Sequence, residues 1–169
     1  MSGMTNDLEN KSKLISKNFD NKELDALLSS GEQVSCSLLS GAIIDLGLKA
    51  RSWLGWQIPI ITNDNYTSSQ IMKIKTDEIL TFISEKGIAI IAGFQGISKE
   101  NRITTLGRGG SDLSAVAIAK FFKTDSCEIY TDVEGVLTTD PSINEKAKKI
   151  DKISYEEMLE MASLGAKVM

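Results

Sequence analysis

Apolar residues recur along the chain with two different spacings. Residues 88–92 form a continuous apolar run of strand length, and residues 127–131 also have a strand pattern. The remaining patterns are strands over residues 49–53, 57–62 and 69–74 and helices over residues 22–48, 76–86, 113–122 and 154–163. Because helices alternate with strands, the chain is predicted to have an α/β fold with a largely parallel sheet.

Three local signals predict where helices end or begin. Gly31 interrupts the first long helical pattern, so we expect a break or two helices there. Gly47 is a plausible stop for the same stretch. Ser154 with Glu157 three residues later forms a capping-box pattern at the start of the last helix.

Glu32 is unusual because it lies one helical turn after Leu28, on a row that is otherwise apolar. An unpaired buried carboxylate is costly, so one interpretation is that Glu32 faces a cation or a polar cleft. The alternative is that the Gly31 break turns Glu32 to solvent at the start of a second helix, where the helix dipole favours an acid.

The glycine-rich stretch 104–112, with the sequence TTLGRGGSD, follows a buried strand (residues 87–94) and a polar loop and precedes the helix 113–122. Unpaired N–H groups at a helix start attract anions, and Arg108 adds a planar fork suited to a carboxylate or a phosphate. This favours an anion-holding loop. The alternative is a tight turn with Ser111 as the N-cap and a solvated Arg108.

Composition excludes several classes of function. The net charge is −4, from 19 basic and 23 acidic residues, so neither nucleic acid nor an acidic membrane surface is favoured as a partner. The chain has no histidine, which excludes a catalytic triad of Ser, His and Asp and any His-ligated metal. Without a membrane-length apolar run, a secretory segment or a metal-type cysteine spacing, it is expected to be soluble and cytoplasmic.

Five motifs then occur in order: SGEQVS at 30–35, AGFQG at 92–96, TTLGRGGSD at 104–112, IYTDVEGV at 129–136, and the segment 154–168. Together they resemble the aspartokinases of the amino acid kinase family. The resemblance implies a three-layer α/β/α sandwich, incomplete here. It also implies transfer of the ATP γ-phosphate to the β-carboxylate of L-aspartate, giving 4-phospho-L-aspartate on the route to lysine, threonine, methionine and diaminopimelate.

The resemblance assigns site residues where the motifs match. Arg108 corresponds to the arginine that pairs with the substrate α-carboxylate, and Glu32 to the acid that receives the substrate ammonium. Gly109, Gly110 and Ser111 correspond to the lining of the substrate and phosphate pocket. Substrate recognition would therefore use one cation and one anion at opposite ends of an amino acid.

The family's catalytic and nucleotide positions fall on further residues. Asp112 matches an acid that organises a catalytic lysine, and Lys167 matches a lysine close to the ATP phosphates. ATP contacts are implied for Thr131, Asp132, Leu137, Ser142 and Lys167, although Leu137 replaces a usual tyrosine and Ser142 a usual arginine. Mg²⁺ would bind with ATP, held by phosphate oxygens and water rather than by a metal site of this chain.

The same resemblance suggests how the chain is organised. Residues 1–169 correspond to the central part of an amino acid kinase catalytic domain, with the N-terminal Lys-x-Gly-Gly-Thr-Ser loop and the C-terminal regulatory ACT domains absent. One hypothesis is an enzyme that acts as a homo-oligomer or with a complementing N-terminal fragment. A second is an inactive truncated remnant, or a module that binds aspartate or nucleotide without transfer. A third, a kinase for another amino acid, is disfavoured by Glu32 and Arg108.

Overall fold

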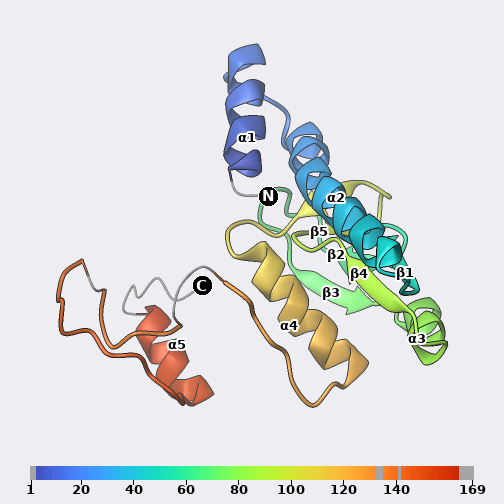
Figure 1. Cartoon of the computed structure of the whole chain (residues 1–169). Coiled ribbons are helices and arrows are strands. Elements are labelled where there is room, and N and C mark those ends of the chain that lie inside the picture. Colours follow the sequence, from blue (N-terminus) through green and yellow to red (C-terminus); the bar gives the residue numbers. More distant parts are fainter. Residues whose placement is uncertain (1–2, 132–134, 141, 164–169) are drawn as a thin grey trace. The chain divides into compact units, whose positions relative to one another are not determined.

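The structure, a computed structural model, describes residues 3–131, 135–140 and 142–163. The chain divides into two units, Met1–Cys127 and Glu128–Met169, and each is described by itself (Figure 1). The first unit contains α1 (Met4–Ile15), α2 (Asn21–Asp45), β1 (Ala50–Trp53), β2 (Ile60–Thr62), β3 (Ile71–Ile74), α3 (Asp77–Ser84), β4 (Ile88–Ile91), β5 (Gln95–Ile97), β6 (Ile103–Thr105) and α4 (Gly110–Phe122). The second contains α5 (Tyr155–Ser163). The predicted alternation of helices and strands is confirmed for the first unit.

Strand pairing in the first unit is mixed. β1 pairs with β4 in parallel, and the other four strands follow the order β3-β2-β5-β6. Only β2 and β5 are parallel in that second sheet, because β2–β3 and β5–β6 are antiparallel pairs. The prediction of a largely parallel sheet is corrected in this respect. The reason is that β5 and β6 form a hairpin within the segment expected to be a polar loop, and short connections give antiparallel neighbours.

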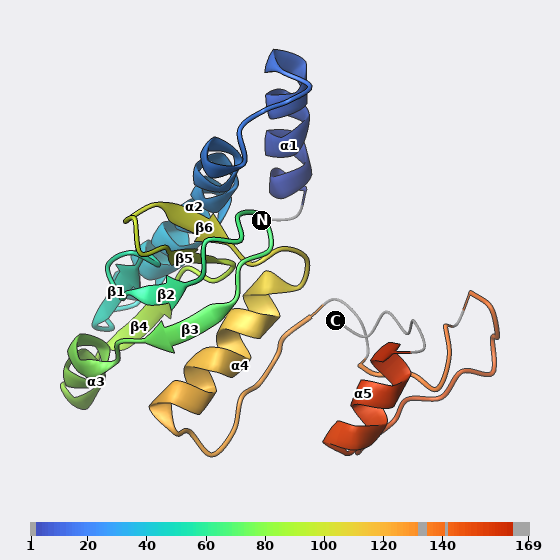
Figure 2. The same cartoon turned by 180° about the vertical axis from the view of Figure 1, so that it is seen from behind.

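Helices cover both faces of these strands. α2 packs against β1, β4 and β6, while Ala117, Ile118 and Phe122 of α4 pack on the core from the other side (Figures 1 and 2). The core itself is a cluster of one aromatic and four isoleucine side chains, namely Trp53, Ile58, Ile60, Ile74 and Ile79. The first unit is therefore an incomplete α/β/α sandwich, as the resemblance implied.

The expected break at Gly31 does not occur. α2 runs through this position without interruption, and it starts at the N-cap Asp20, whose carboxylate accepts from the N–H groups of Lys22 and Glu23. Gly31 is instead a contact point, because a Cβ atom there would lie 3.0 Å from Met4 Cγ of α1. The helix ends where predicted, with Gly47 in the left-handed region at φ +80°.

The second unit confirms one local prediction and corrects another. Residues 127–131 form no strand, and Tyr130, which is 90% exposed, donates its hydroxyl to Glu128 only two residues away. The apolar pattern there meets no neighbouring strand among the residues that the structure describes. The capping box at α5 is confirmed: Ser154 N–H donates to Glu157 Oε2 at 2.8 Å, and Glu157 N–H donates to Ser154 Oγ at 3.2 Å.

Loss of the capping box is expected to unwind the first turn of α5. The Ser154 N–H and hydroxyl lower the pKa of Glu157 from its usual 4.5, so this stabilisation is present at neutral pH and is lost as pH falls below about 4.5. Ser154→Ala should lower the local helix equilibrium roughly fivefold. It should weaken that pH dependence only in part, because the backbone N–H of residue 154 still donates to Glu157. Cα chemical shifts of residues 155–158 measure both effects, and Ser163→Ala at the opposite helix end is the control. Equal pH profiles in the two variants would contradict the prediction.

Candidate functional site

The glycine-rich loop and the start of α4 form one wall of the site. Gly107 and Gly109 have φ values of +79° and +68°, so both need the left-handed conformation that glycine adopts readily. The N-cap of α4 is Gly109, not Ser111 as the alternative interpretation required, and no side chain caps the helix start. Ser111 lies inside the first turn. An uncapped helix start beside Arg108 favours the anion-holding interpretation.

Close contacts explain why glycines are required here. A Cβ atom at Gly110 would lie 2.7 Å from Phe94 Cδ2 and 3.0 Å from Leu106 Cβ. Phe94, with φ +65°, holds this position because its N–H donates to Ser114 Oγ and its carbonyl accepts from Leu106 N–H. The Phe94 turn thus presses directly against the start of α4.

α2 presents Glu32 to the same site. Because α2 is continuous, Glu32 is in mid-helix and cannot lie at the start of a second helix, which removes the solvent-exposed alternative. Its side chain is half-buried and lines the pocket in the same row as Leu24 and Leu28. The inward row of α2 therefore places the Glu32 carboxylate in a polar cleft.

A pocket of about 360 Å³ lies between these elements. It brings together five of the residues assigned from sequence: Glu32, Arg108, Gly109, Gly110 and Ser111. Arg108 is exposed, and no described residue forms a salt bridge with it. A pocket lined by the Glu32 carboxylate and by a guanidinium that forms no salt bridge matches a ligand that carries both a positive and a negative charge.

Other lining residues were not found from sequence. α1 contributes Thr5 and Glu9, which lie one turn apart. Thr67, Phe94 and Thr105 complete the polar and aromatic lining. The four-residue spacing of Thr5 and Glu9 is a helical signal, but it is too short to indicate which way that face points.

Asp25 is a buried acid beneath the pocket that sequence reasoning also missed. Its side chain has no exposed surface, and its carboxylate accepts from Thr67 N–H, Thr105 N–H and the Thr105 hydroxyl. Burial raises the pKa of the Asp25 carboxyl, and the hydrogen bonds from Thr105 and Thr67 oppose that shift. The available signal was its position two helical turns before Glu32, on the inward row.

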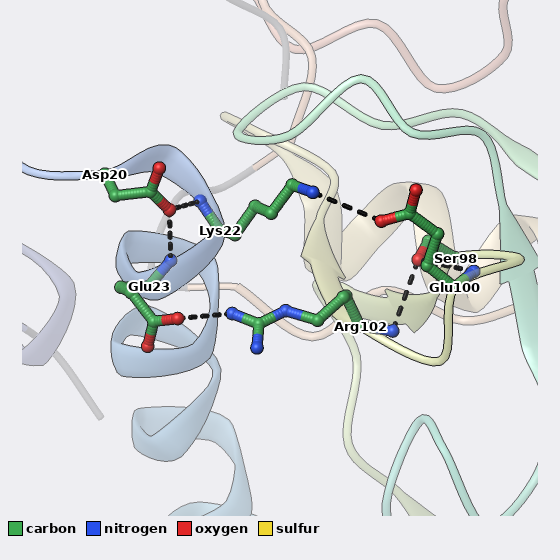
Figure 3. A network of polar contacts seen from close by, with 6 residues as sticks. All are labelled: Asp20, Lys22, Glu23, Ser98, Glu100 and Arg102. Atoms are coloured by element: carbon green, nitrogen blue, oxygen red, sulfur yellow. Dashed lines mark hydrogen bonds and ion pairs between the residues drawn. The ribbon is translucent and has the colours of Figure 1, made fainter.

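An exposed ionic network joins the start of α2 to the β5–β6 hairpin (Figure 3). Lys22 pairs with Glu100 at 3.1 Å, and Arg102 pairs with Glu23. The hairpin turn is closed by Ser98, whose hydroxyl accepts from the N–H groups of Glu100 and Arg102. Each exposed pair contributes little by itself, so the network orients the hairpin rather than forming a binding site.

Neither a metal-binding cluster nor a membrane-spanning helix is found among the described residues. Among the described residues, no group of three or more Cys, Asp or Glu side chains is arranged to hold a metal ion. Within the same part of the chain, every helix is too short or too polar to cross a bilayer.

The sequence pattern of the amino acid kinase family matches residues 2–169. The chain belongs to this family. The fold of the first unit, with helices on both faces of a mixed set of strands, agrees with that membership.

This amino acid kinase chain is 48% identical over 169 residues to the aspartate kinase Ask_LysC of Stutzerimonas stutzeri and 49% identical to the aspartokinase of Geobacillus stearothermophilus. Both comparisons cover the whole chain, which spans 41% and 42% of the relatives' length. The aspartate kinase of Synechocystis matches with a TM-score of 0.83 and 44% identity, over 100% of this chain and 27% of that one. E. coli aspartokinase III in complex with aspartate and ADP matches with a TM-score of 0.79 and 32% identity, over 89% and 34% of the two chains.

Of the other residues assigned from family resemblance, only Asp112 belongs to the first unit. Asp112 is half-buried in the first turn of α4 and does not line the pocket. Thr131, Leu137 and Ser142 belong to the second unit, while Asp132 and Lys167 lie outside the described residues. The nucleotide half of an amino acid kinase site thus stays a prediction from sequence.

Proposed function

We propose that this chain binds L-aspartate between Glu32 and Arg108, as the acceptor site of an aspartate kinase. The observation that carries the proposal is that one pocket is lined by a carboxylate, Glu32, by a guanidinium, Arg108, and by the uncapped start of α4. The aspartokinase relatives agree with it, and one of the matched solved structures is described as a complex with aspartate and ADP. The proposed reaction is transfer of a phosphoryl group from ATP to the β-carboxylate of L-aspartate.

The residues of the pocket have distinct roles in this proposal. The Arg108 guanidinium binds the α-carboxylate with two parallel hydrogen bonds, and the positive end of α4 adds to the attraction. Glu32 receives the ammonium group. The β-carboxylate is then directed toward Gly109, Gly110 and Ser111. A carboxylate is already ionised at neutral pH, so the protein positions the nucleophile without a general base.

ATP with Mg²⁺ supplies the transferable phosphoryl group when bound. The residues proposed to hold it are Thr131, Asp132 and Lys167, with Asp112 as the acid that organises a catalytic lysine. These assignments depend on the match to the family motifs. The glycine-rich start of α4 has no side-chain cap. Helix starts of this kind bind anionic oxygens.

A second candidate function, binding without transfer, is favoured by two details of the second unit. The Ser142 hydroxyl donates to Asp140 Oδ1 at 2.6 Å, within a local turn. Leu137 forms a β-bridge with Lys149, so it too belongs to local structure. These two positions hold an arginine and a tyrosine in the family pattern, and neither replacement offers the same contact to a nucleotide.

Calorimetry tests the proposed binding of L-aspartate, and a transfer assay separates the two candidates. L-Aspartate is expected to bind, and succinate, which lacks the ammonium group, to bind about tenfold more weakly because it makes no ion pair with Glu32. Equal affinities would contradict the assignment of Glu32.

Hydroxylamine trapping with Mg-ATP and L-aspartate then reports transfer. Aspartate binding with no hydroxamate favours the binding module, and no aspartate binding overturns the proposal.

A further inference from the structure

We propose that Asp25 is the positioning residue of the pocket: its carboxylate holds Thr67 to Thr105 and thereby fixes the loop that carries Arg108. The inference rests on the proposed function where it is measured by aspartate binding. In this role Asp25 sets the shape of the pocket without touching the ligand.

The geometry around Asp25 is that of an ion held by neutral donors. Oδ1 accepts from the Thr105 hydroxyl at 2.6 Å and from Thr67 N–H at 3.0 Å. Oδ2 accepts from Thr105 N–H at 2.8 Å and from the same Thr67 N–H at 3.0 Å. No lysine or arginine among the described residues forms a salt bridge with it. All of these hydrogen bonds join the Asp25 carboxylate to Thr67 and Thr105, which both line the pocket.

These two residues control the position of the Arg108 loop. Thr67 has φ +68°, an uncommon conformation for a β-branched residue, and its N–H is held by Asp25. Its carbonyl oxygen would lie only 3.1 Å from a Cβ at Gly107, so the Thr67 turn rests directly on the loop. Ser69 N–H also donates to the Thr105 carbonyl at 2.9 Å. One carboxylate therefore joins α2, residues 63–70 and β6 at the base of the pocket.

A purely space-filling role does not account for this residue. Burial raises the pKa of Asp25, which means that the site disfavours the ionised form, and an apolar side chain would fill the same space without that penalty. What an apolar side chain lacks is the ability to accept from Thr67 and Thr105 at once. Asp25 can therefore fix the position of the pocket lining, because Thr67 and Thr105 both belong to it.

Asp25→Asn is the decisive variant because it keeps the shape of the side chain. Its NH₂ group can face the Thr105 hydroxyl, which turns to accept, while its oxygen keeps the two backbone N–H donors, so the protein should fold. One bond to Thr67 and the charge are lost. We expect L-aspartate affinity to fall about tenfold and to fall further in Asp25→Ala, as the pocket walls shift.

Asp20→Ala is the matched control. It removes an acid from the same helix and two hydrogen bonds to backbone N–H groups, but it touches neither Thr67 nor Thr105. It should lower stability while leaving the aspartate dissociation constant within about twofold of the wild-type value. A loss of affinity as large as that of Asp25→Asn would mean that lower stability alone explains both, and the proposal would be wrong.

Amide shifts of the ligand-free protein give a second measurement that does not depend on aspartate binding. In Asp25→Asn, changes reaching Gly107, Arg108 and Gly109 support the positioning role. Changes confined to Thr67 and Thr105 contradict it, as does unchanged affinity in a protein that binds L-aspartate. A wild-type chain that binds no L-aspartate overturns the proposed function alone, and the amide shifts then decide the role of Asp25.

Discussion

Arg108→Gln is expected to weaken L-aspartate binding about a hundredfold. Two charge-assisted hydrogen bonds to the α-carboxylate contribute about 3 kcal/mol together, which corresponds to that factor. Arg108 forms no salt bridge with any described residue, so its removal leaves no protein carboxylate unpaired. The loss therefore measures the contact with the ligand. Calorimetry at two salt concentrations checks both its size and its electrostatic origin.

Two further variants sharpen the Arg108 experiment. Arg108→Lys keeps the charge but not the planar fork, so it should recover only part of the affinity. Arg51→Gln makes the same change of net charge at a guanidinium that stacks on the Trp53 ring, 3.8 Å from its centroid, outside the pocket. It should leave the dissociation constant within about twofold of the wild-type value. Equal losses in Arg51→Gln and Arg108→Gln would show that long-range charge, not a contact, controls binding.

Features that depend on neighbours in sequence were predictable. The helical row of α2 placed Glu32 on the inward face, and the glycine-rich stretch indicated a loop leading into α4. The capping box of α5 is a pattern of two residues three positions apart, and the structure has both of its hydrogen bonds. In each case the residues that decide the geometry lie within one or two helical turns of each other.

Features that depend on distant partners were not predictable. Gly31 was expected to break α2, yet the contact that explains this glycine comes from Met4 on another helix. Asp25 is buried because Thr67 and Thr105 supply its donors, and no spacing along the chain indicates that they meet. The strand pattern at residues 127–131 had the same weakness, because a strand requires a partner strand that the local sequence cannot specify.

Gly96→Ala is expected to destabilise the first unit by about 3 kcal/mol. Gly96 is buried in β5, and a Cβ atom there would lie 2.5 Å from Thr62 Cγ2 and 2.6 Å from the Ile60 carbonyl oxygen. The second contact is with backbone, so it cannot be relieved by a rotamer change, and β5 must move away from β2. Such a shift also strains the buried hydrogen bond between the Thr62 and Thr104 hydroxyls, whose oxygens are 2.6 Å apart. Chemical denaturation followed by tryptophan fluorescence measures the loss.

The chain offers a matched control and a partial rescue for this substitution. A Cβ at Gly41 in α2 would have no heavy atom within 4 Å, so Gly41→Ala adds the same methyl group in open space and should stabilise the helix by up to about 1 kcal/mol. Thr62→Ser removes the methyl group nearest to the added Cβ but leaves the Ile60 carbonyl in place. Combined with Gly96→Ala, it should therefore recover part of the lost stability and not all of it. Full recovery would locate the clash at the Thr62 methyl group alone, and no recovery would locate it at the backbone of β2.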